Sequence, residues 1–232
     1  MAKRKVLKQK KTQKKNKKTV EIIPAILVHT KAELKEKLKK VEKLVKTVQI
    51  DIADGFFVPN TTIQAAQFRH IKVKPKLEIH LMVKNPIKYI VDYSKIGAYR
   101  IIFHYESCKD DKEVERLIDI IKFKKIKTGI AISPQTPASK IKKFLDKIEV
   151  VQVMPIYPGF AGQRFMSSQL AKVRQIRKWN KKTAIQIDGG VHPGTASKCV
   201  HAGATRLAAG SYLWKSENIK KAIMELKKDA KL

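Results

Sequence analysis

Short apolar runs alternate with longer amphipathic stretches along most of this chain. The short runs are rich in Ile and Val, which is typical of strands buried on both faces, whereas the longer stretches repeat apolar residues every three or four positions, as helices do. We therefore predict strands at 21–28, 48–53, 76–82, 99–104, 127–132, 149–154, 183–188 and 205–210. Helices are predicted at 31–46, 86–96, 112–123, 137–145, 167–178, 193–202 and 216–227.

The order of these elements predicts the fold class. Eight strands, nearly all followed by a helical stretch within about 210 residues, are the pattern of a closed (β/α)8 TIM barrel in a single domain. The connection 58–71 is the least clearly helical one. An open doubly wound sheet is the alternative, but regular repetition without a GxGxxG turn makes it less attractive.

Three of the predicted strands carry ionisable side chains where the pattern calls for buried ones. Asp51 lies in VQIDIA, His80 in LEIHLM and Asp188 in AIQID. A lone buried carboxylate is costly unless another group pairs with it, and barrel enzymes build their sites at the C-terminal ends of the strands. We therefore expect these three side chains to form one polar site. Because alternate residues of a strand share a face, each of the three has neighbours on its own side of the strand. They are Gln49 and Ala53 for Asp51, Glu78 and Met82 for His80, and Gln186 for Asp188.

Glycine-rich turns follow the last three predicted strands, in YPGFAGQRF (157–165), DGGVHPGTA (188–196) and AAGSYLW (208–214). Glycines let backbone N–H groups approach an anion, and a helix beginning after Ser211 would direct its dipole at it. Tight turns are the plainer explanation for any one of them. Together they predict a phosphate site, because barrels often hold a substrate phosphate in these loops. Its predicted residues are Gly159, Phe160, Ala161, Gly162, Gly189, Gly190, Gly210 and Ser211.

The composition fits a folded protein of 232 residues, with 43% apolar residues to form a core. No run of 18 apolar residues occurs, so we expect neither membrane insertion nor secretion. Cys108 and Cys199 have no metal-like spacing, which favours a reducing compartment. We expect a cytoplasmic protein.

The charge is strongly positive, with 51 Lys and Arg against 20 Asp and Glu, a net charge of +31. Ten of the basic residues fall within 1–18, which contains no acidic residue. We predict a disordered basic tail at 1–20 and a barrel domain at 21–232. Such a tail can bind RNA or another polyanion non-specifically, and a merely solvated tail is the alternative. A homo-oligomer is possible, but no motif specifies one, and the high charge opposes close approach of identical copies. The oligomeric state therefore stays open.

Several segments, taken in order, resemble the ribulose-phosphate 3-epimerase family of the pentose phosphate pathway. They are VQIDIADGFFVPN, EIHLMVKNP, IYPGFAGQRF, QIDGGV and AGATRLAAGS, and the resemblance covers about 22–226. It implies an isomerase of carbohydrate metabolism that interconverts D-ribulose 5-phosphate and D-xylulose 5-phosphate. Related decarboxylases and hexulose-phosphate synthases carry a lysine where Ala53 stands, which disfavours them.

The resemblance also implies a mechanism. Epimerisation next to a ketone needs two acid/base groups on opposite faces of the carbon, and by resemblance these are Asp51 and Asp188. A divalent metal ion (Zn, Fe, Mn, Co or Mg) would stabilise the enediolate, held by Asp51, His80, Asp188 and the residue at position 49. Met82 and Met154 match methionines that line the family's substrate site.

This chain departs from the family pattern at several site positions. Gln49 stands where the family has a second histidine, and an amide oxygen is a poorer ligand for transition metals than imidazole, which favours Mg²⁺ or Mn²⁺. Ala25 replaces a serine, Ala53 a methionine, and Tyr157 an asparagine. The departures leave a second hypothesis: a catalytically weak or inactive barrel that binds phosphate or polyanions.

Overall fold

The computed structural model describes residues 20–68 and 70–231. Within them, eight parallel strands pair in sequence order and close into a barrel, because β1 also pairs with β8. The predicted TIM barrel is therefore confirmed, and the open sheet is excluded. The strands are β1 (Glu21–Ile26), β2 (Thr47–Ala53), β3 (Lys76–Met82), β4 (Arg100–His104), β5 (Lys127–Ile132), β6 (Val150–Val153), β7 (Ala184–Asp188) and β8 (Arg206–Ala209).

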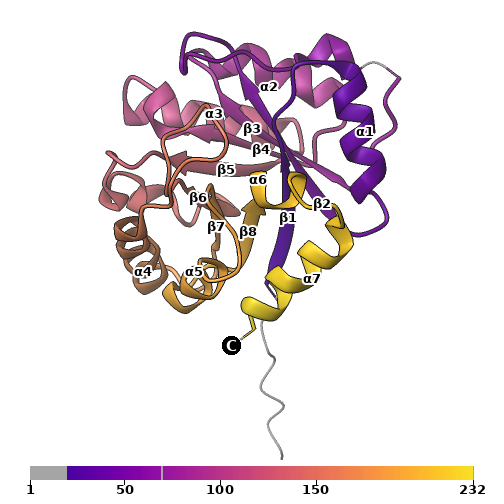
Figure 1. Ribbon diagram of the computed structural model, residues 1–232. Helices are drawn as coiled ribbons and strands as arrows, with labels where there is room; N and C mark the ends of the chain where they lie inside the picture. Colours follow the sequence, from indigo (N-terminus) through magenta and orange to yellow (C-terminus); the bar gives the residue numbers. More distant parts are fainter. Residues whose placement is uncertain (1–19, 69, 232) are drawn as a thin grey trace, which may run out of the picture.

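Helices lie around the outside of the strands (Figure 1). The α-helices are α1 (Lys31–Val41), α2 (Pro86–Lys95), α3 (Asp111–Phe123), α4 (Leu170–Trp179), α5 (Ala196–Ala202), α6 (Ser211–Trp214) and α7 (Ile219–Asp229). Short 3₁₀ helices are η1 (Ala65–Phe68), η2 (Tyr105–Ser107), η3 (Ala138–Phe144) and η4 (Ser167–Gln169). None of these helices is both long and apolar enough to span a lipid bilayer. Most of the predicted tail, residues 1–19, lies outside the described residues.

Two predicted helices differ from the structure. The segment predicted as a helix at 137–145 is the 3₁₀ helix η3, which buries Ala138, Ile141 and Phe144. A spacing of three places these side chains on one face of a three-residue turn, whereas an α-helix would spread them. The helix predicted at 31–46 ends at Val41, because the chain turns there to enter β2 at Thr47.

The core has two parts, divided by the strands. The larger part packs the outward faces of the strands, such as Ile50 and Ile52, against helix residues such as Leu34. The barrel interior is smaller and in places very close-packed. A Cβ on Gly129 would lie 2.4 Å from Val150 Cγ1, so only glycine fits at that point of β5. Much of the rest of the interior is polar, and the candidate site lies at its C-terminal end.

Candidate active site

A pocket of about 250 Å³ opens at the C-terminal ends of the strands. Asp51 and His80 enter it from the neighbouring strands β2 and β3, and Asp188 enters from the end of β7. Gln49 is fully buried below this lining. The structure thus brings together the other residues predicted for the site: Asp51, His80, Met82, Met154, Gly159, Phe160, Ala161, Gly162, Asp188, Gly189, Gly190, Gly210 and Ser211.

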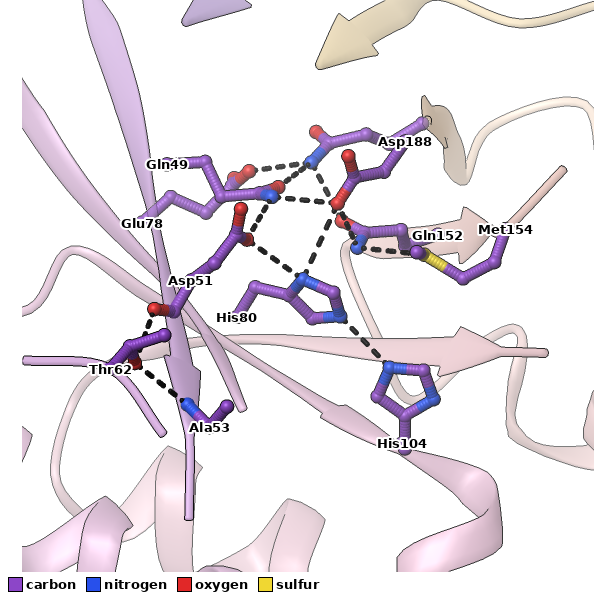
Figure 2. A network of polar contacts seen from close by, with 11 residues as sticks. Gln49, Asp51, Ala53, Thr62, Glu78, His80, His104, Gln152, Met154 and Asp188 are labelled. Carbon is purple, nitrogen blue, oxygen red and sulfur yellow. Dashed lines mark hydrogen bonds and ion pairs between the residues drawn. The ribbon is translucent and has the colours of Figure 1, made fainter. Parts of the chain in front are cut away.

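The two aspartates and the histidine form one cluster (Figure 2). His80 Nδ1 lies 3.0 Å from Asp51 Oδ1 and 3.3 Å from Asp188 Oδ2. Both carboxylates are nearly buried, at 8% and 7% exposure, yet both line the pocket. Thr62 holds the end of β2 in place, because its hydroxyl donates to Asp51 O and accepts from Ala53 N, both at 2.9 Å. The cluster is therefore rigidly mounted and open on one side.

Two members of the cluster, Asp51 and His80, have raised pKa values. Burial raises the pKa of Asp51, and the nearby charge of Asp188 adds to this, against the hydrogen bond from His80. Burial alone would lower the pKa of His80, but its hydrogen bonds to Asp188 and Asp51 and their charges raise it to about 9. Without a cation in the site, these contacts favour the protonated ring of His80 at neutral pH, and a metal ion bound to Nδ1 would replace that proton.

The same three residues fit a divalent cation. Their ligand atoms, two carboxylate oxygens and one imidazole nitrogen, lie within 4.8 Å of one another. Such a mixed oxygen and nitrogen set suits Mn²⁺, Fe²⁺, Co²⁺ or Zn²⁺. The pocket side of the cluster leaves room for substrate atoms beside an ion, as catalytic metal sites require.

A second histidine orients His80 from behind. His80 Nε2 lies 2.9 Å from His104 Nε2, and His104 Nδ1 lies 3.1 Å from Glu106 Oε2. An ionised carboxylate only accepts hydrogen bonds, so His104 Nδ1 carries the proton and its Nε2 accepts from His80. The Nδ1 edge of His80 is thereby directed at the two aspartates. We did not identify His104 and Glu106 from the sequence. A signal was present, because His104 lies at the end of its strand in FHYE, as His80 lies near the end of β3.

Glu106 is firmly ionised. Burial by itself would raise its pKa, but hydrogen bonds from His104, the Thr136 hydroxyl and the Ser133 amide outweigh burial and lower the pKa to about 2. The Ser133 N–H lies 2.8 Å from Glu106 Oε1. Burial lowers the pKa of His104, which keeps that ring neutral. The proton arrangement between the two histidines is therefore well defined.

Gln49 faces the cluster with its nitrogen. Its Nε2 donates to Asp51 Oδ1 and to Asp188 Oδ2, each at 2.7 Å. The amide oxygen, which we expected from the sequence to face a metal ion, accepts a hydrogen bond from Gln186 instead.

The glycine loops form the other end of the pocket. Gly189 has φ +116, and a Cβ there would lie 2.3 Å from Ile156 Cγ1, so this turn requires glycine. Asn60 Nδ2 donates to Gly159 O at 2.7 Å and ties the connection after β2 to the glycine loop after β6. The helix after Ser211 is only four residues long, so a macrodipole contributes less than the sequence suggested.

A lysine and a tryptophan form one wall of the pocket and were not found from the sequence. Lys37 Nζ lies 5.1 Å from the centre of the Trp214 ring and donates to Leu27 O at 3.4 Å. Trp214 Nε1 donates to Ala25 O at 2.6 Å, which fixes the indole against β1. Lys37 is one of many lysines on α1, and nothing in their spacing singles it out.

Comparison with known proteins agrees with this geometry. The model of the ribulose-phosphate 3 epimerase family matches residues 21–214. The chain belongs to this family. It is 35% identical to the ribulose-phosphate 3-epimerase of Bacillus subtilis over 216 residues, covering 90% of this chain and 98% of that protein. Identity to the cytoplasmic isoform of rice is 34%, covering 89% and 92% of the two chains, and to the Escherichia coli enzyme 31%, covering 90% and 95%.

Solved structures of lower identity share the fold. A 3-hexulose-6-phosphate synthase from Salmonella typhimurium has a TM-score of 0.68 at 13% identity, covering 90% of this chain and 98% of its own. Orotidine 5'-phosphate decarboxylase from Pyrococcus horikoshii has a TM-score of 0.63 at 15% identity, covering 90% and 98%. These similarities concern the barrel alone.

Proposed function

We propose that this protein is a working ribulose-phosphate 3-epimerase, which interconverts D-ribulose 5-phosphate and D-xylulose 5-phosphate. The observation that carries the proposal is the pairing of Asp51 and Asp188. The two carboxylates come from strands far apart in the chain, line one pocket and share His80 as a partner within 3.3 Å.

In this mechanism one aspartate removes the proton from C3 of the sugar and the other returns a proton to the opposite face. The raised pKa of Asp51 makes its carboxylate a stronger base than an aspartate in water. Asp51, His80 and Asp188 would hold a divalent ion, which would supply a Lewis acid for the negative charge that develops on the sugar oxygens. Met82 and Met154 cover the reacting carbon and exclude water.

The glycine loops are proposed to hold the phosphate. The backbone N–H groups of 159–162, 189–190 and 210–211 bind its oxygens, and the Ser211 hydroxyl adds a donor. The exposed Phe160 side chain closes over the sugar. Lys37 contributes a positive charge to the same pocket.

A proton-exchange measurement tests the proposal. Purified protein is incubated with D-ribulose 5-phosphate in D2O, with Mn²⁺, Zn²⁺, Fe²⁺, Co²⁺ or Mg²⁺ in turn. We expect deuterium at C3 by NMR and formation of D-xylulose 5-phosphate with at least one of these ions. If no ion supports exchange, the epimerase proposal fails, and exchange with another ketose phosphate would change the proposed substrate.

The net charge of +31 favours a second property, polyanion binding through the basic residues of 1–18. This proposal rests on the sequence, since 1–19 lie outside the described residues. Deleting 1–18 should leave turnover within about twofold and lower the salt concentration at which the protein leaves an RNA or heparin column. A large loss of turnover would show that residues 1–18 are needed for catalysis. By likeness to the rice isoform, we also propose a cytoplasmic location.

A further inference from the structure

A cluster of three glutamines lies directly beneath the two aspartates, inside the barrel. Gln49, Gln152 and Gln186 come from β2, β6 and β7, and none of them is exposed to solvent. Figure 2 shows the side-chain amides of Gln49 and Gln152 directed toward Asp188. Because a buried amide has one donor end and one acceptor end, the direction in which each faces decides what it offers to the site above.

Charged groups fix the direction of Gln186, at the bottom of this cluster. Arg206 Nε donates to Gln186 Oε1 at 2.7 Å, and an arginine can only donate. Gln186 Nε2 lies 2.7 Å from Glu78 Oε1, and an ionised carboxylate can only accept. Glu78 also accepts hydrogen bonds from two guanidinium groups, of Arg100 and Arg206. Reversing Gln186 would therefore oppose donor to donor and acceptor to acceptor.

Gln186 in turn fixes the direction of the two other glutamines. Its Nε2 lies 2.8 Å from Gln49 Oε1 and 2.8 Å from Gln152 Oε1, and since one of its two protons is directed at Glu78, the other is shared between these two amide oxygens. Both of these amides therefore turn their nitrogen upward. Gln49 donates to Asp51 and Asp188, and Gln152 Nε2 donates to Asp188 Oδ2 at 2.8 Å. Asp188 Oδ2 thus receives two amide donors from below.

We propose that Gln49 is a hydrogen-bond donor that positions Asp51 and Asp188, and that it is not a metal ligand. A divalent ion at this site then has three protein ligands, Asp51, His80 and Asp188. The part of this inference that concerns the ion rests on the proposed function. A ligand at position 49 would have to present its oxygen, and Arg206 and Glu78, acting through Gln186, oppose that rotation.

The arrangement has a functional consequence. The amide donors direct both carboxylates toward the pocket before any ion arrives, so the acid/base pair is pre-oriented by the protein itself. The same donors compete with an ion for carboxylate oxygens. The ion is therefore held less tightly than it would be by four ligands.

Binding of Mn²⁺ to the full-length protein without substrate tests the role of Gln49. Isothermal titration calorimetry and EPR give the affinity and the stoichiometry for the wild type, Gln49→Met and Gln49→Glu. We expect one ion per wild-type chain, binding to Gln49→Met at least as tight as to the wild type, and binding to Gln49→Glu at least tenfold tighter. The first substitution removes a competing donor, and the second adds a charged oxygen.

The opposite result is equally clear. Binding weakened tenfold or more in Gln49→Met, with an unchanged melting temperature, would show that the Gln49 oxygen is a ligand and would overturn the proposal. No Mn²⁺ binding by the wild type would overturn the three-ligand ion site. Gln64→Met is the matched control, because the Gln64 amide donates to the Ala53 and Thr62 carbonyls and not to the aspartates, so Mn²⁺ affinity should stay unchanged.

Gln186→Met tests whether the orientation comes from below. Without Gln186, Gln49 can rotate and present its oxygen, so Mn²⁺ binding should tighten by threefold or more. Unchanged affinity in a folded variant would show that Gln186 does not control Gln49, and the inference would fail. None of these measurements uses a sugar, so they stand apart from a failure of epimerase turnover.

Discussion

One buried carboxylate lies below a pair of buried carboxylates in this barrel, and the surroundings of the two levels differ. Below, Glu78 is wholly buried and contacts the guanidinium groups of Arg100 and Arg206. Above, the hydrogen-bond partners of the Asp51 and Asp188 side chains within 20–68 and 70–231 are glutamine amides and the imidazole of His80. The lower charge is therefore paired with two guanidinium groups, whereas the upper pair has no arginine or lysine ion-pair partner among the described residues.

The difference separates a structural charge from a functional one. A buried ion pair that is complete needs nothing from solvent, and removing one partner leaves the other uncompensated. Carboxylates that border a pocket with neutral donors and one titratable ring hold a proton or a cation loosely enough to exchange it. The upper pair has the properties that proton transfer requires.

Substitution of either upper carboxylate should give the largest effect. Asp51→Asn and Asp188→Asn each remove one acid/base group, so C3 proton exchange should fall by about 10³-fold or more, while the melting temperature stays the same or rises. Exchange and thermal unfolding are measured on both variants, with the exposed Asp119→Asn as control. If either variant kept more than a tenth of the exchange rate, Asp51 and Asp188 would not be the acid/base pair that distinguishes them from the structural Glu78.

Substitution of the lower carboxylate should act on stability. Glu78→Gln leaves the buried Arg100 guanidinium without a counter-charge and leaves Arg206 with Glu21 as its remaining acidic partner, so the free energy of unfolding should fall by about 3–5 kcal/mol. Glu115→Gln is the control, because Glu115 forms an exposed pair with Lys147 at 2.7 Å and should lose less than about 1 kcal/mol. Urea unfolding at pH 7 measures both, and equal losses would contradict the structural role of Glu78.

Glu106 gives a pH-dependent intermediate case. Its pKa of about 2 in the folded protein lies below the value near 4.5 of an unperturbed glutamate, so its contribution is present above pH 4.5 and is lost as the pH falls toward 2. Glu106→Gln should therefore lower the free energy of unfolding by about 3 kcal/mol at pH 6 and by little near pH 2. Unfolding curves across this range give the difference, and a pH-independent difference would refute the ionised state.

The smallest effect is expected at the cation of the pocket wall. Lys37→Met should raise KM for ribulose 5-phosphate about tenfold, equivalent to about 1.4 kcal/mol, with little change in stability, because Lys37 is not an ion-pair partner of Glu78. Lys39→Met, an exposed lysine of the same helix, is the control and should leave KM unchanged. A loss of stability in Lys37→Met would mean that Lys37 has a structural role, as Arg100 and Arg206 do in pairing with Glu78.

Much of the fold could be predicted from the sequence, because strand burial and helix amphipathicity are local properties. The predicted strands agree with the observed ones to within one or two residues at most ends, and the period of two put Asp51, His80 and Asp188 on single faces of their strands. The exceptions have local causes as well. Apolar residues recur every three positions in 138–144, which fits the 3₁₀ helix observed there, whereas we predicted an α-helix from the same residues.

The sequence by itself determined the barrel and the set of polar residues inside it, since alternation along a strand depends only on neighbouring positions. Only the tertiary structure decided how those residues meet. Gln186 reaches Gln49 across 137 positions of sequence, and Arg206 reaches Glu78 across 128. Whether an amide presents its nitrogen or its oxygen depends on such contacts, because both ends have nearly the same shape and only the charges around them distinguish one from the other.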